Sequence, residues 1–296
     1  RLPRLSETDV SVARTRILSM FEDPQGGWGS GFDALTKQLS PAHPTWINPF
    51  GLHDSVVKAG PELATMRWTS ISDGPLRAAV IANTDLPQAE AAVRAADRWM
   101  IHRSARPKVC PPTSPSQPRS TTGTLTVRSM TASHAWVGVA IGAADGQTET
   151  WLDTLVEALN GPDGTLAVAI SQLPRGSAKA TARSVGGAIQ RALIIDIDCQ
   201  ESATDDAIRT VKTMLQKLQA EGFSEAQLAR ASRLNGQGQL KGRLDPRRRI
   251  VDLWKGRTST PENWTVDASK VWLKSSLQES NMQAVRVLTA EPSQQD

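Results

Sequence analysis

KATARSVGGAIQRALIIDID, from Lys179 to Asp198, is the stretch of sequence that decides the fold class. Two segments of strand length, Lys179–Val185 and Ala188–Asp198, flank the pair Gly186-Gly187. A glycine pair between two strands favours a tight hairpin turn. It can also form an anion-binding nest, but no helix start and no Lys-Ser/Thr follows it, so we interpret it as a hairpin. The stretch therefore predicts two antiparallel strands joined by a short turn.

Outward from this hairpin, predicted strands come in pairs and predicted helices come in runs. Upstream, strands at 123–128 and 134–141 lead into helices at 149–159 and from 164. Downstream, a helix with apolar residues three to four apart is followed by Ser224 and Gln227, which form a capping box for a helix through Leu234. Helices at 246–255 and 267–277 and a strand at 282–289 complete the series. This order predicts an α+β domain with helices packed on one face of a mainly antiparallel sheet.

The first hundred residues predict a second, incomplete set of elements. Ser6–Glu22 is a helix with Ser6 as its N-cap, and a loop rich in Pro and Trp follows it. After Gly51 we expect helices to about 59 and from 61 to about 69, a buried strand at 76–82 and a helix at 86–102. The stretch 104–120 is rich in Pro, Ser and Arg. We therefore predict a partial first domain over 1–103, a linker over 104–120 and a second domain over 121–296.

Composition excludes several classes of function. The charge of +4 comes from scattered Lys and Arg, and aromatic residues make up only 4%, which argues against nucleic-acid binding. No apolar run reaches the roughly 20 residues that a membrane span needs. The two cysteines do not form a disulfide framework. No signal segment is recognisable at Arg1, so we expect that any targeting segment was removed or was never part of this sequence.

Four segments carry a resemblance to a known family. His43-Pro44 with Pro49-Phe50-Gly51, Ala79–Ala96, Leu155–Leu166 and Thr204–Arg233 are similar, in order and spacing, to motifs of the pitrilysin and insulinase zinc metallopeptidases. That family includes the mitochondrial processing peptidase and the core proteins of a respiratory cytochrome complex. The resemblance implies two related α+β domains, joined by a linker, that make one half of a clamshell. It also favours a periplasmic, cell-envelope or organellar location, although the compartment stays open.

The zinc ligands of that family are missing from this sequence. The family holds zinc with an inverted H-x-x-E-H and a distant glutamate, whereas the histidines His43, His53, His102 and His134 lie ten or more residues apart. On the helix that resembles the distant-glutamate helix, Ala13 and Met20 stand at the ligand positions and cannot bind zinc. Glu22 is off register by about two residues, roughly 200° around the helix. The Arg and Tyr pair of active members is also incomplete, because the chain has no tyrosine.

These observations lead to one main hypothesis and two alternatives. We expect no catalytic, metal or cofactor site in this chain, and a non-catalytic subunit that completes the peptide chamber of a zinc-bearing partner or serves a larger assembly. Zinc would then belong to the partner chain. The alternatives are the C-terminal fragment of an active zinc metalloendopeptidase whose zinc motif lies on a missing N-terminal piece, and a stand-alone peptide- or protein-binding module that uses a sheet edge.

Two polar groups have a more local interpretation. Arg247, Arg248 and Arg249 follow Pro246 at a predicted helix start, where cations oppose the helix dipole, so either solvent or an acidic partner surface compensates them. Asp196 and Asp198 alternate with isoleucines on a strand. We interpret them as the water-facing side of a half-exposed strand rather than as paired catalytic carboxylates.

Overall fold

The computed structural model describes residues 5–22, 29–42, 47, 51–72, 85–97, 123–129, 133–142, 146–174, 178–186, 190–245 and 265–289. Within those residues, the elements before residue 123 are all helices: α1 (Glu7–Glu22), α2 (Ser30–Leu39), α3 (His53–Val57), α4 (Pro61–Ser72) and α5 (Leu86–Asp97). The predicted strand at 76–82 and the predicted linker at 104–120 lie outside the described residues, as do His43, Pro44, Pro49 and Phe50.

Among the described residues from 123 onward, the chain forms a five-stranded sheet and the remaining helices. The strands are β1 (Thr124–Ser129), β2 (His134–Gly142), β3 (Ala178–Gly186), β4 (Arg191–Cys199) and β5 (Met282–Thr289). The helices are α6 (Gly146–Leu159), α7 (Thr165–Ile170), α8 (Thr204–Glu221), α9 (Glu225–Leu244) and α11 (Val266–Ser276), with short 3-10 turns at Glu201–Ala203 and Glu279–Asn281. The expected order of elements from residue 123 is confirmed, apart from the predicted helix at 246–255, which lies outside the described residues.

The sheet has the strand order β1-β5-β2-β4-β3. Only the β1–β5 pair is parallel, so the sheet is mainly antiparallel, as the sequence predicts. The hairpin is also confirmed, because β3 and β4 pair up to Gly186 and Arg191 on either side of the turn. Gly186 has a φ of 124°, which a side chain would strain. The strand β5 lies between β1 and β2, parallel to β1 and antiparallel to β2.

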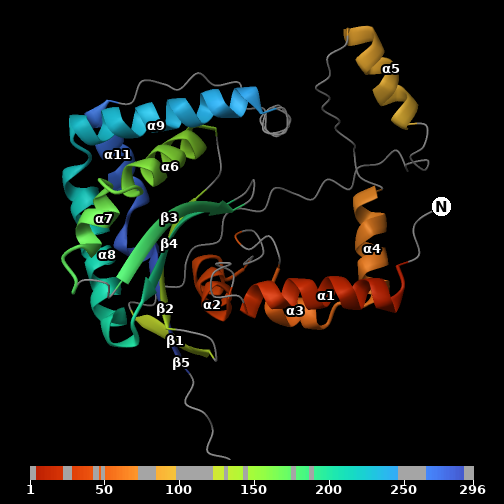
Figure 1. The fold of residues 1–296 in the computed structure, drawn as a ribbon, viewed down its shortest axis with the longest axis horizontal. Coiled ribbons are helices and arrows are strands. Elements are labelled where there is room, and N and C mark those ends of the chain that lie inside the picture. Colours follow the sequence, from red (N-terminus) through yellow and green to blue (C-terminus); the bar gives the residue numbers. More distant parts are fainter. Residues whose placement is uncertain are drawn as a thin grey trace, which may run out of the picture.

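One face of the sheet carries the main core. Helices α6, α7, α8 and α11 cover this face, and α9 packs against α6 (Figure 1). Leu155, Ile195 and Leu215 are fully buried there. Each such side chain stabilises the fold by about 1.5–3 kcal/mol relative to its exposed state. The stripe of apolar residues on the helix that follows the hairpin is confirmed, since Ile208, Val211, Leu215 and Leu218 are all buried.

The other face of the sheet is covered by α2, which the sequence reasoning missed (Figure 1). The expectation of a loop after Glu22 is wrong for residues 30–39. Phe32, Leu35 and Leu39 repeat at helical spacing and are fully buried against the sheet. The flanking Gly, Pro and Trp residues hide this short stripe in the sequence. Among the described residues, helices therefore lie on both faces, with one run on the main-core face and α2 on the opposite face.

The helices of the first part have their own local contacts. Ser6 caps α1 as predicted, because its Oγ accepts a hydrogen bond from the Asp9 amide at 3.1 Å. The Asp9 carboxylate accepts one in return from the Ser6 amide at 3.1 Å, and the Ser6 hydroxyl lowers the pKa of Asp9. Helix α1 packs against α3 and α4. Within the described residues, no helix combines the length and the apolar character that crossing a membrane requires.

Candidate functional site

The two positions that the sequence resemblance assigns to zinc ligands, Ala13 and Met20, lie on α1, and their side chains do not fit a metal ion. Ala13 is exposed and Met20 is half-buried, and neither carries a nitrogen or oxygen ligand. Arg14, between them, is engaged elsewhere, because its Nη1 donates a hydrogen bond to the carbonyl of Ala59 at 3.1 Å. This contact ties α1 to the segment between α3 and α4.

The described histidines are also engaged in local contacts. His53 packs edge-on against Phe21, with ring centroids 5.7 Å apart, and its Nδ1 lies 3.6 Å from Asp54. His134 lies in β2 beside Asp196. Across the residues that the structure describes, no group of three or more His, Cys, Asp or Glu side chains is close enough to hold a metal ion. His43 and His102 lie outside the described residues.

A polar cluster lies on the α2 side of the sheet, and the sequence reasoning did not find it. Asp196 accepts a hydrogen bond from Arg183 Nη2 at 2.5 Å and a second, short contact joins it to His134 Nε2. The guanidinium of Arg183 also lies over the Trp136 ring, 5.3 Å from its centroid. These residues come from three adjacent strands, β2, β3 and β4.

The cluster corrects half of the interpretation of the two aspartates. Asp198 is exposed, as expected for the water-facing side of a strand. The side chain of Asp196 keeps only 21% of its surface exposed and contacts Arg183 and His134, so water is not its main partner. The register of the hairpin could have predicted the contact between Arg183 and Asp196. Strands β3 and β4 pair Thr181 with Asp196, and this places Arg183 diagonally across from the carboxylate. The contacts of this cluster join β2, β3 and β4 across the sheet.

Helix α2 is anchored beside this cluster by very close contacts. Phe32 packs edge-on against Trp136, with ring centroids 5.5 Å apart. A Cβ added at Gly31 would come within 2.4 Å of Val287, and one at Gly138 within 2.7 Å of Leu39. At the end of the helix, Ser40 Oγ donates to Gln190 Oε1 at 2.9 Å. Gly31 on the helix and Gly138 on β2 thus let the backbone of α2 approach the strands closely.

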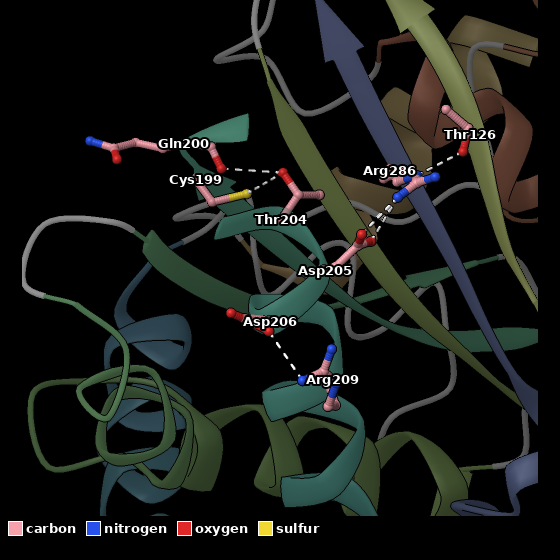
Figure 2. Close-up of polar contacts among 8 residues, drawn as sticks. All are labelled: Thr126, Cys199, Gln200, Thr204, Asp205, Asp206, Arg209 and Arg286. Carbon is pink, nitrogen blue, oxygen red and sulfur yellow. Dashed lines mark hydrogen bonds and ion pairs between the residues drawn. The ribbon is translucent and has the colours of Figure 1, made fainter. Parts of the chain in front are cut away.

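The start of α8 carries the other notable group of polar side chains (Figure 2). Arg286 of β5 donates to both carboxylate oxygens of Asp205, at 2.9 and 2.8 Å, and to Thr126 Oγ1 at 2.7 Å. Cys199 lies nearby with its sulfur 3.6 Å from the Thr204 hydroxyl. Burial raises the pKa of the Cys199 thiol, so it stays protonated and is a poor nucleophile at neutral pH. The contacts of Arg286 join β1, β5 and α8.

The predicted partner contacts Arg247, Arg248 and Arg249 lie outside the described residues, so that assignment stays a prediction.

Comparison of the structure with solved structures identifies the class of fold. The chain matches a protease from Helicobacter pylori with a TM-score of 0.76 and 13% identity, over 96% of this chain and 73% of that one. It matches the inactive domain of an M16 peptidase from Pseudomonas fluorescens with a TM-score of 0.70 and 14% identity, over 98% and 73%. It also matches a chain of complex III from Candida albicans with a TM-score of 0.71 and 11% identity, over 95% and 70%.

Comparisons with protein-family models and with curated protein sequences find no match. The matches to solved structures show that the chain has the fold of the M16, or pitrilysin-like, peptidases. They confirm, at the level of fold, the resemblance noted in the sequence. At 11 to 14% identity, these similarities establish the fold and do not establish an activity.

Proposed function

We propose that this chain is a non-catalytic pitrilysin-like subunit. It completes the peptide chamber of a zinc-bearing partner chain or serves as a structural subunit of a larger assembly. The observation that carries the proposal is the pair Ala13 and Met20 on α1, which stand where the resemblance places zinc ligands and which cannot bind the ion. The sequence also contains no H-x-x-E-H and no tyrosine. A chain of this fold without those groups keeps the scaffold and lacks the chemistry.

Two of the similar structures support this role. One is described as the inactive domain of an M16 peptidase, so the fold occurs without activity. Another belongs to complex III, so the fold also occurs in a multi-chain assembly. Complementary charge would favour assembly here as well, because this chain carries a net charge of +4 and would associate fastest with an acidic surface.

The experiment is reconstitution with a candidate partner that has the same fold and an intact H-x-x-E-H. Hydrolysis of a quenched fluorescent peptide library is measured for each chain alone and for the mixture. We expect a stable complex, no hydrolysis by this chain, and greater hydrolysis by the mixture than by the partner alone. The matched control is the partner with its motif glutamate changed to Gln, which should remove activity from the mixture while leaving the complex intact. Hydrolysis by this chain alone would overturn the proposal and favour the active-fragment alternative.

A further inference from the structure

The strand β3 is at one edge of the sheet, and a side chain occupies the middle of its outer side. Asn160 Nδ2 donates a hydrogen bond to the carbonyl of Ala182 at 2.8 Å, and the amide of Ala182 donates to Asn160 Oδ1 at 2.8 Å. A carboxamide that both gives and accepts a hydrogen bond at one residue reproduces the pairing that a neighbouring strand would make there. Asn160 therefore takes the place of a sixth strand at the centre of β3.

Asn160 is held in this position by its own surroundings. It follows the end of α6, where its amide donates to the carbonyl of Val156 at 3.0 Å. Its carbonyl accepts a hydrogen bond from Arg230 Nη2 of α9 at 3.2 Å. The next residue, Gly161, has a φ of 87°, and a Cβ there would come within 2.7 Å of the Arg230 guanidinium. The turn is thus built to present the carboxamide to β3.

We propose that Asn160 closes the β3 edge against strand addition, and that the chain it excludes is a second copy of this one, pairing through its own β3. The backbone groups of Ala182 point away from β4, and in a regular strand those of Ser184 point the same way. Without Asn160, this edge would offer a row of unpaired groups to the same row of another molecule. The proposal is independent of the proposed function. It also argues against β3 as a docking edge for peptides.

The test compares Asn160→Ala with Asn160→Asp by sedimentation velocity over a wide range of protein concentration. Asn160→Ala loses both hydrogen bonds to Ala182, whereas Asn160→Asp loses only the bond that Nδ2 donates and keeps a bulky, charged group at the edge. We expect Asn160→Ala to self-associate beyond the state of the unchanged chain, and Asn160→Asp to retain that state. Adding Ser184→Pro to Asn160→Ala removes an outward amide and should reverse the association. A folded Asn160→Ala that keeps the unchanged state would overturn the proposal, and so would association that persists with the proline.

A measurement on the unchanged chain covers the case in which Asn160→Ala does not fold. Amide hydrogen exchange should be at least about tenfold slower at Ala182 than at Ser184, because within the described part of the chain a side chain accepts from the amide of Ala182 and none from that of Ser184. Equal exchange at the two residues would show that the carboxamide does not hold the edge, and would overturn the proposal.

Discussion

The two faces of the sheet are built in different ways. The main-core face is lined by apolar residues of every strand except β1 and is buried by helices of the second part of the chain. The opposite face is covered by α2, which comes from before β1, and it also carries the cluster of His134, Arg183 and Asp196. The first face therefore depends on helices from the same part of the chain as the strands, and the second on a helix from the first part of the chain. Substitutions should be able to loosen the α2 face while the main core stays folded.

The largest effect should come from the main core. Leu155 of α6 is fully buried, so Leu155→Ala should lower the free energy of unfolding by about 2–5 kcal/mol. Urea denaturation followed by circular dichroism measures this change. Val168→Ala is the matched control, because Val168 is 56% exposed and its truncation should cost less than about 0.5 kcal/mol. Similar losses for both variants would contradict this description of the core.

The α2 face should respond next. A side chain at Gly138 would push against the ends of Leu35 and Leu39, so Gly138→Leu should cost about 1–3 kcal/mol. Limited proteolysis should then cut within residues 30–39 before it cuts the sheet. The control Gly236→Ala adds a methyl group where nothing lies within 4 Å and should not destabilise the chain. Cleavage of both regions at equal rates in Gly138→Leu would mean that the two faces unfold together.

The polar cluster should give an intermediate effect. Asp196→Ala leaves His134 and Arg183 without their shared carboxylate and should cost about 1–3 kcal/mol. Asp198→Ala is the control on the same strand, and it should change stability by less than about 0.5 kcal/mol because Asp198 is exposed. Thermal unfolding of the two variants compares them directly. Equal effects would restore the interpretation that both aspartates simply face water.

The smallest effect is expected at the start of α8. Asp205 pairs with Arg286 through both of its oxygens, but its side chain is 62% exposed, so Asp205→Ala should cost less than about 1 kcal/mol. The loss should shrink as salt is added, because the pair is close to solvent. Urea unfolding at low and high ionic strength checks this. A loss that does not depend on salt would indicate a role in packing.

The sequence was a good guide to elements whose pattern is local. The hairpin around Gly186, the stripe of α8 and the final strand at 282–289 all follow from spacing within a few residues, and the structure confirms them. The capping box is confirmed as well, with the Ser224 amide donating to Gln227 Oε1 at 2.9 Å. The two-residue alternation of strands and the 3.6-residue periodicity of helices were enough to predict these elements.

The sequence was a poor guide to features that depend on distant segments. Helix α2 is only 10 residues long, and its burial depends on Gly138 and Trp136, far along the chain. The pairing of Asn160 with Ala182 depends on how the α6–α7 turn meets the sheet edge. Neither contact leaves a periodic signal. The identities of Ala13 and Met20 are given by the sequence, but their assignment to zinc-ligand positions rests on the resemblance and stays a prediction.

The most direct test of the central claim is a zinc measurement on the purified chain. The chain is equilibrated with micromolar zinc, dialysed, and analysed for bound metal while peptide hydrolysis is assayed on the same sample. We predict well under one zinc ion per chain and no hydrolysis, because this sequence has no H-x-x-E-H and carries Ala13 and Met20 where the resemblance implies a zinc ligand. One tightly bound zinc per chain, together with hydrolysis that a chelator abolishes, would contradict the account.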